Sequence, residues 1–212
     1  MYKVRIRYEK RDKLAYISHL DLMKALQRAF LRAGLPVKYS QGFNPHINMS
    51  ILAPLSTGHS SICELCDLEL TEDELSADIV ERLNAVLPEG LKVSGAWTPQ
   101  SKASEIAYCA YDIVYFCKMD ECISESFVSP VIIEKKSKRG SLQADVFDYI
   151  QAISFRDAPE GTLCSCVLKA GNDTLNPVYV TASLQQKGFI GSDVLAKYTR
   201  THIFDKNCQD FV

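Results

Sequence analysis

The sequence predicts an α+β protein of two ferredoxin-like (βαββαβ) domains in tandem, with the second domain degenerate. Between residues 2 and 97, segments with strand and helix periodicity follow the order strand, helix, strand, strand, helix, strand. A polar stretch without periodicity, residues 98–104, then precedes a second set of similar segments. We therefore expect an N-terminal domain over 1–97, a linker over 98–104 and a C-terminal domain over 105–212.

The first elements have clear local signals. Residues 2–9, YKVRIRYE, alternate between apolar and charged side chains, which predicts a strand with one buried and one open face. A helix is expected over 18–33, because Ser18 and Asp21 form a capping-box pattern and Gly34 can end the helix. The remaining expected elements of this domain are strands over 46–53 and 62–70, a helix over 72–87 opened by Thr71 and Glu74, and a strand of sequence LKVSGAW.

The second half has weaker periodicity. Residues 105–117 are apolar at most positions, which is typical of a central strand. The further expected elements are a short helix over 119–127, a hairpin of 130–136 with 142–154, a strand over 162–169, a helix over 176–187 and a strand over 198–204. Residues 143–153 fit either a helix or a strand, and the sequence leaves this choice open.

The charge of the chain is distributed unevenly. The net charge is −2, but residues 1–59 contain ten Lys or Arg and three acids, a net +7, while the rest carries −9. A basic segment on an acidic chain favours either a polyanion site or a surface that docks onto acidic groups. Composition alone does not separate these two.

Composition also bears on the cellular location of the protein and on the state of its cysteines. No stretch approaches the ~20 apolar residues of a membrane span, and the N-terminus lacks the apolar core of a signal peptide, so we expect a cytoplasmic protein. The eight cysteines are then expected to be reduced. Cys63 and Cys66 lie three apart in a predicted strand and would point to opposite faces, so we expect no metal site and no cofactor.

Basic and aromatic residues near the first helix predict a nucleic-acid site. Lys24, Arg28 and Arg32 recur every fourth residue and form one basic ridge, while a turn-prone loop follows the helix. Cationic groups bind phosphates, and aromatic side chains stack on bases. The expected RNA-binding residues are Arg5, Arg7, Lys24, Arg28, Arg32, Lys38, Tyr39, Ser40, Gln41, Gly42, Phe43, Asn44 and His46. The alternative is a solvated helix face, with Arg5 and Arg7 paired to Asp67 and Glu69 on a neighbouring strand.

Two histidines allow a second hypothesis. His19 and His46 could act as general base and acid in metal-free RNA cleavage, provided that both reach one phosphate. The simpler alternatives are a hydrogen bond at the helix start for His19 and a contact that anchors the loop for His46. The sequence contains no P-loop, dinucleotide-binding glycine motif or GxSxG elbow.

Residues 16–50, YISHLDLMKALQRAFLRAGLPVKYSQGFNPHINMS, together with APLSTG, resemble the radical-SAM-linked protein family of bacteria. Members stand alone or are fused to the C-terminus of a radical SAM protein. The resemblance implies a radical SAM partner, in some cases one that binds cobalamin, but it implies no activity for this chain. A fold-level similarity to the repeat-RNA endonucleases of CRISPR systems is weaker, because their Gly-rich C-terminal loop is not evident.

The expected function is therefore that of an RNA-binding accessory protein, without catalysis of its own, that presents tRNA or rRNA to a radical SAM modifying enzyme. The alternatives are an endoribonuclease using His19 and His46, and a module that only docks the partner protein. The sequence does not identify the RNA or the oligomeric state.

Overall fold

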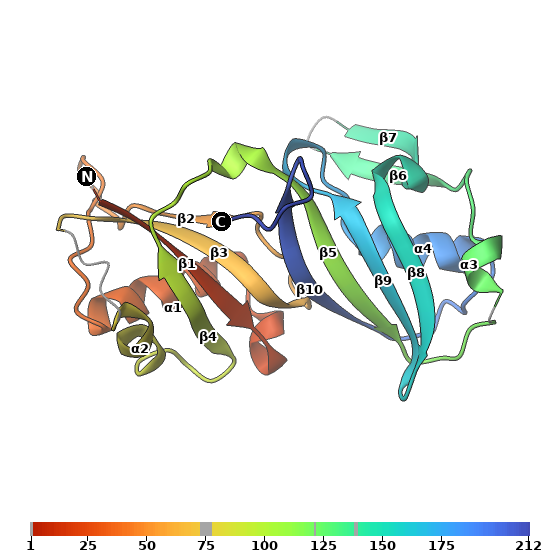
Figure 1. The fold of residues 1–212 in the computed structure, drawn as a ribbon, viewed down its shortest axis with the longest axis horizontal. Helices are drawn as coiled ribbons and strands as arrows, with labels where there is room; N and C mark the ends of the chain where they lie inside the picture. Colours follow the sequence, from red (N-terminus) through yellow and green to blue (C-terminus); the bar gives the residue numbers. More distant parts are fainter. Residues whose placement is uncertain (1, 73–77, 121, 138–139) are drawn as a thin grey trace. The chain divides into compact units, whose positions relative to one another are not determined.

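The computed structural model describes residues 2–72, 78–120, 122–137 and 140–212 of a mixed α+β protein with antiparallel sheets and few helices (Figure 1). The chain divides into two compact units. Unit 1 comprises Met1–Glu105 with Phe211–Val212, and unit 2 comprises Ile106–Asp210. The stretch predicted as a linker thus lies within unit 1, as do the last two residues, which were expected in the C-terminal domain.

Unit 1 contains a four-stranded antiparallel sheet with strand order β4-β1-β3-β2. Its elements in chain order are β1 (Tyr2–Lys10), η1 (Asp12–Tyr16), α1 (His19–Arg32), β2 (Met49–Leu52), β3 (Ser60–Leu70), α2 (Ile79–Asn84), β4 (Leu91–Trp97) and η2 (Ala103–Glu105). The strand and helix order predicted for residues 2–97 is therefore present.

One hydrophobic cluster joins both helices of unit 1 to its sheet. Val4, Ile6 and Tyr8 of β1 are buried in it, which confirms the face predicted from the alternation of this strand. The helices contribute Leu22, Leu26 and Phe30 from α1 with Ile79 and Leu83 from α2. The odd-numbered residues of β1 therefore belong to the opposite sheet face, which carries the basic side chains considered below.

Local signals fix the ends of α1. The Ser18 hydroxyl accepts a hydrogen bond from the Asp21 backbone N–H at 3.1 Å and donates one to the Asp21 carboxylate at 2.8 Å. Gly34 has φ +68°, a left-handed conformation that glycine adopts without strain. The predicted helix is thus confirmed to within its terminal residues. For the helix predicted over 72–87, the described part is Ile79–Asn84, and Glu74 of its predicted cap lies outside the described residues.

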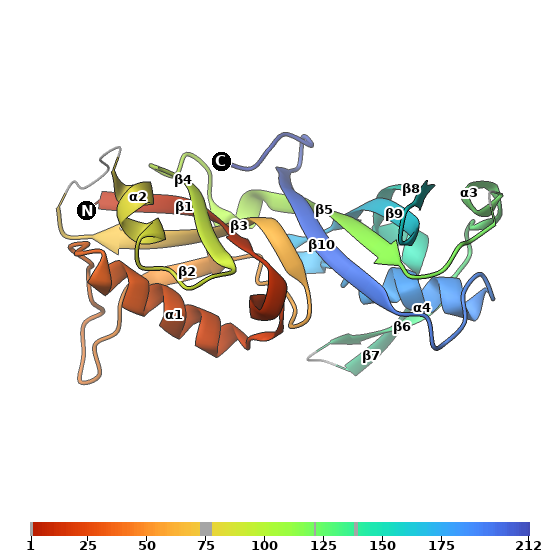
Figure 2. The same cartoon turned by 90° about the horizontal axis from the view of Figure 1, so that it is seen from below.

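In unit 2, four antiparallel strands pair in the order β10-β5-β9-β8. Its elements are β5 (Ile106–Tyr115), α3 (Ile123–Ser126), β6 (Ile132–Ser137), β7 (Gly140–Asp145), η3 (Val146–Tyr149), β8 (Ile150–Ala158), β9 (Gly161–Lys169), η4 (Gly171–Asp173), α4 (Val178–Gln186) and β10 (Ala196–Asp205). The hairpin β6–β7 and α4 lie on the same side of this sheet (Figure 2).

The ambiguous window 143–153 is neither one helix nor one strand. Asp145 ends β7, and its carboxylate accepts hydrogen bonds from the backbone N–H groups of Val131 and Phe147 at 3.0 and 3.1 Å. The bond from Phe147 caps the single 3₁₀ turn of η3, after which β8 begins at Ile150. The predicted strand over 142–154 is therefore wrong: the segment consists of two strands that belong to different sheets.

The buried face of the unit 2 sheet contains a chain of hydroxyl groups. The Tyr115 hydroxyl lies 2.9 Å from the Thr181 hydroxyl on α4, which lies 2.7 Å from the Tyr198 hydroxyl. Burial raises the pKa of Tyr115 far above its usual value, so the phenol stays neutral. These hydroxyl contacts place α4 on the inner face of the sheet.

Candidate nucleic-acid interface

The 39–46 loop forms a hairpin that projects beyond the end of α1 (Figure 2). The Ser40 backbone N–H donates to the His46 carbonyl at 2.8 Å, and Tyr39 and Ile47 form a bridge at its base. At the tip, Gly42 has φ +127°, a backbone conformation that residues other than glycine rarely adopt. Residues 41–46 are all exposed.

Aromatic rings occupy the accessible parts of this loop. The Phe43 side chain is 112% exposed relative to a free residue, and Tyr39 is 43% exposed. Rings exposed to this degree are accessible to a flat ligand that can stack on them. The predicted loop residues Ser40, Gln41 and Asn44 lie beside them, so the loop combines rings with hydrogen-bonding groups.

The basic ridge lies on the exposed side of α1. Lys24, Arg28 and Arg32 are all exposed. Lys24 is within 3.9 Å of the Asp21 carboxylate, a surface pair of little energetic weight, and Arg32 donates to the Val86 carbonyl at 2.7 Å. Within the described part of the chain, Arg28 forms no ion pair or hydrogen bond. The ridge therefore retains positive charge that is available to an anion.

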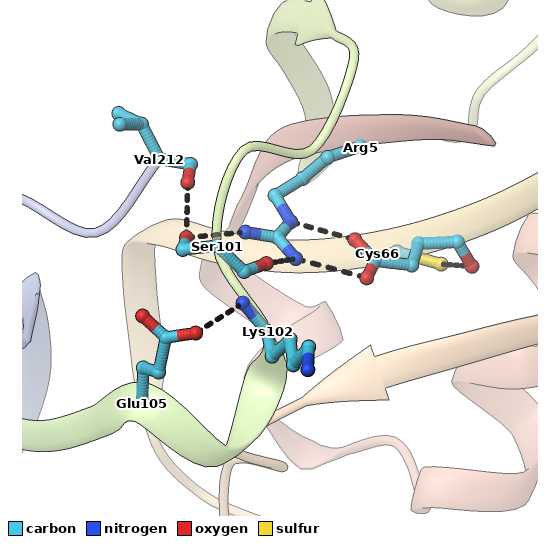
Figure 3. A network of polar contacts seen from close by, with 7 residues as sticks. Arg5, Cys66, Ser101, Lys102, Glu105 and Val212 are labelled. Carbon is cyan, nitrogen blue, oxygen red and sulfur yellow. Dashed lines mark hydrogen bonds and ion pairs between the residues drawn. The ribbon is translucent and has the colours of Figure 1, made fainter.

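Arg5, by contrast, is removed from the predicted interface. It is 0% exposed and forms two hydrogen bonds to the Asp67 carboxylate, at 2.6 and 2.9 Å. It also donates to the Ser101 hydroxyl and carbonyl at 3.3 and 3.0 Å (Figure 3). Its guanidinium lies 4.8 Å from the ring centroid of Phe211. The Ser101 hydroxyl in turn donates to the Val212 carbonyl. The donors of Arg5 are thus directed to protein acceptors, which corresponds to the cross-strand alternative.

Arg7 has a different environment on the same face. It is half-buried, with its guanidinium carbon 5.5 Å from the ring centroid of Trp97 on β4. Its buried Nε has no hydrogen-bond partner among the described residues. Trp97 rather than the predicted Glu69 is therefore the contact of Arg7. Stacking on an indole leaves the charge of the guanidinium unneutralised.

The Glu69 carboxylate interacts with two further basic residues, Lys38 and Lys3, near the base of the loop. Its carboxylate accepts from Lys38 at 3.1 Å and from the Asn48 amide at 3.2 Å, and it lies 3.9 Å from the Lys3 ammonium. The hydrogen bond from Lys38 lowers the pKa of Glu69 against the opposing effect of its desolvation. Lys3, Asn48 and Glu69 line a surface depression of about 290 Å³. Lys38, one of the predicted RNA-binding residues, is thus half-buried and paired with Glu69.

Replacing Glu69 by glutamine is expected to destabilise the protein by about 1 kcal/mol at neutral pH, because Lys38 loses its charged partner. A lowered folded-state pKa contributes stability above the unfolded-state pKa of about 4.3, and this contribution is lost as pH falls through the folded value. Urea unfolding should therefore separate the variant from wild type at pH 7, and the difference in unfolding free energy should shrink as the pH falls through the lowered pKa of Glu69. The exposed Glu72→Gln is the matched control, and an equal effect of both changes would contradict the role of Glu69.

The two histidines lie at opposite ends of α1. His19 is its first residue, whereas His46 belongs to the loop that follows its last turn, and a helix of 14 residues is roughly 20 Å long. His46 Nδ1 lies 3.0 Å from the Ser40 hydroxyl and 3.4 Å from the Asn44 carbonyl. The structure therefore gives His46 the loop-anchoring contact, while catalysis by His46 together with His19 stays a prediction.

Sequence analysis missed several residues of this surface. Lys3 and Asn48 take part in the Glu69 contacts, and the alternation of residues 2–9 already places Lys3 on the face of Arg5 and Arg7. The outer side of α1 also carries exposed Leu20 and Leu31 beside the basic ridge. Their spacing of eleven residues puts them on one side of the helix, a signal that the sequence contains.

Neither a metal cluster nor a spanning helix is found within the described ranges. No group of three or more His, Cys, Asp or Glu side chains among those residues is arranged to hold a metal ion. None of the described helices is long and apolar enough to cross a membrane. Cys63 and Cys66 are buried free thiols, and burial raises the pKa of Cys66.

Comparisons with known proteins give one family match. Residues 3–177 match the family described as "Uncharacterized protein conserved in bacteria (DUF2344)". No curated protein sequence matches the chain. Among solved structures, the crystal structure of an unknown protein from Galdieria sulphuraria is 12% identical over 94% of this chain and 98% of that chain, with a TM-score of 0.28. That score does not support a shared fold, and none of these matches links the chain to a radical SAM protein, which stays a prediction.

Proposed function

The chain belongs to the bacterial family DUF2344, and from its exposed loop and ridge we propose that it is an RNA-binding accessory protein. The 39–46 loop and the basic ridge of α1 bind the RNA, and the protein presents it to a partner enzyme in the bacterial cytoplasm. The observation that carries the proposal is the full exposure of Phe43 in the loop that follows α1, a helix whose Arg28 is available to an anion.

Single-stranded RNA suits this combination of groups. Its phosphates attract cations placed along a surface, and its unpaired bases stack on aromatic rings. An exposed ring without cations would equally suit an apolar protein partner, and cations without a ring would suit any polyanion. The loop directly follows α1 in the chain, and the two together offer rings and cations, which supports a ligand with both charge and flat rings.

The strand orders support the ferredoxin-like part of the proposal. In unit 1, β4-β1-β3-β2 with a helix after β1 and after β3 is the arrangement of a βαββαβ unit. In unit 2, β10-β5-β9-β8 has the same relation between chain order and strand order, with α4 between β9 and β10. We propose that both units are ferredoxin-like, with β6–β7 inserted in the second.

The partner in this proposal is the radical SAM enzyme that the resemblance implies, in some cases one that binds cobalamin. The pure docking alternative has a separate consequence: complex formation with that enzyme would survive nuclease treatment. A complex that requires intact RNA supports presentation of RNA instead. Co-purification from the native host, with and without nuclease, distinguishes the two.

Binding of single-stranded RNA to the full chain, measured by fluorescence anisotropy across salt concentrations, tests the proposal. Affinity is expected to fall steeply with salt, and Arg28→Ala combined with Arg32→Ala should reduce the log–log salt slope by about 0.7 for each lost phosphate contact. Lys92→Ala is the matched control, because Lys92 is an exposed lysine on β4 that belongs to neither the 39–46 loop nor the basic ridge. A flat salt response, or unchanged affinity in the Arg28/Arg32 variant, would overturn the proposal.

A further inference from the structure

The outer face of the unit 2 sheet carries an ordered set of side chains that the proposed function does not use. Core residues such as Cys109, Ile113 and Ile203 point to the inner face. Their neighbours on β5, β9 and β10 point outward and are half-buried or exposed. The helix α4 covers the inner face only, as the contact of Thr181 with Tyr115 shows.

Two aromatic rings stand at one end of this face. His202 and Phe204 of β10 are stacked, with ring centroids 5.5 Å apart and an interplanar angle of 4°. Phe204 pairs across the sheet with Tyr108 of β5, and His202 is exposed. A bulge between Arg200 and His202 sets the orientation, because it lets Arg200 remain buried while His202 points outward.

A depression begins at Ala110, the cross-strand neighbour of His202. Ala110 pairs with His202 on one side and with Val167 on the other, and Val167 pairs with Ala152. These short side chains, with those of Asp112 and Ser165, line a hollow of about 260 Å³. A volume just below that of drug-sized ligand sites, about 300–1,000 Å³, suits a single flat ring system.

Polar groups lie along the next row of the sheet. The Ser165 hydroxyl donates to the Asp112 carboxylate at 2.7 Å, and Thr199 and Ser154 occupy the corresponding positions on the adjacent strands. A carboxylate has about four acceptor positions, so Asp112 retains capacity for an amino or imino group of a base. The hollow thus has an apolar floor and an acceptor on one side.

Cations lie beyond this polar row. Lys197 of β10 pairs with Val114, and Arg156 of β8 pairs with Leu163, so both belong to the row on the far side of Asp112 from His202. Both side chains are exposed. Along the strands, the row of Phe204 is therefore followed by the row of His202 with the small apolar residues, then by the hydrogen-bonding row, and then by the row that carries Lys197 and Arg156.

We propose that this face binds an unpaired nucleotide of single-stranded RNA, with the base stacked on His202 over the Ala110 hollow. The edge of the base faces Asp112, and the adjacent phosphates contact Lys197 and Arg156. Stacking on an aromatic ring is tolerant of base identity, whereas the carboxylate favours bases that offer N–H donors. This inference rests on the proposed function for the identity of the ligand, but it uses a different unit of the protein.

The test compares the full chain with His202→Ala and His202→Phe, using a labelled RNA decamer and an abasic ribose-phosphate decamer. His202→Ala is expected to weaken binding of the base-bearing RNA about 5- to 100-fold and to leave the abasic oligomer unchanged, while His202→Phe restores the affinity. The exposed Lys206→Ala is the control. Equal affinity of His202→Ala and wild type, or His202→Phe as weak as His202→Ala, would overturn the inference.

The same measurements separate this inference from the proposed function. If Arg28/Arg32 substitution weakens RNA binding and His202→Ala does not, only the inference fails. If His202→Ala weakens binding and the Arg28/Arg32 variant does not, the site in unit 1 fails and the site in unit 2 stands. Absence of RNA binding by the wild-type chain rejects both.

Discussion

Arg5→Ala is expected to destabilise unit 1 by about 3–5 kcal/mol, the usual effect of removing one partner of a buried ion pair. The substitution leaves the Asp67 carboxylate without its counter-charge and the Ser101 carbonyl without its donor. It also removes the group on which Phe211 packs, so attachment of the last residues to the sheet should weaken. Trp97 is the only tryptophan of the chain and lies in unit 1, so its fluorescence during urea unfolding reports the change.

Arg7→Ala is the matched control for this experiment. Arg7 lies on the same strand face two residues later, stacks on Trp97 and forms no ion pair in the described part of the chain. Its removal is expected to be less destabilising, by about 1 kcal/mol or less. A stable Arg5→Ala protein that has lost RNA binding would show instead that Arg5 is a binding residue.

The contrast between Arg5 and Arg7 shows what the sequence of β1 could and could not predict. Alternation placed both on the face opposite the core, and neighbouring strands made Asp67 a candidate partner of Arg5. The further contacts of Arg5 come from Ser101, 96 residues away, and from Phe211. No local pattern encodes these contacts, so the burial of Arg5 was not predictable.

Local chemistry predicted α1 and the exposed loop well. Hydrogen bonds between Ser18 and Asp21, and the left-handed Gly34, depend on residues a few positions apart. The strand predicted to start at residue 46 begins at Met49, as β2. The reason is that Ile47 pairs with Tyr39 and so belongs to the hairpin of the loop. Pairing across a hairpin is set by the turn as well as by alternation.

The aromatic face of unit 2 was missed for a related reason. Strict alternation would give Arg200, His202 and Phe204 the same environment, and the segment reads as an ordinary strand. The bulge before His202 breaks this period, so Arg200 is buried while the two rings remain outside. A bulge depends on pairing with β5 and is not visible in the residues of β10 alone.

Phe43→Ala is expected to weaken binding of single-stranded RNA about tenfold, and Phe43→Ala with Tyr39→Ala about a hundredfold, because each ring offers a stacking surface for one base. The unfolding free energy should hardly change for Phe43→Ala, since a fully exposed side chain contributes little packing. Fluorescence anisotropy with the RNA decamer and its abasic counterpart provides the measurement. The loss should appear only with the base-bearing RNA.

Phe43→Trp is the matched variant for this prediction, because it keeps an aromatic ring at the tip of the loop. It should bind at least as tightly as wild type, since indole stacks strongly and remains apolar. Gln41→Ala, at a neighbouring exposed position, should have a smaller effect than Phe43→Ala. If Phe43→Ala weakens the abasic oligomer as much as the RNA, the loop acts by shaping the phosphate site and not by stacking. If it changes neither, the exposed ring serves a protein partner, and the docking alternative replaces RNA binding as the function of this loop.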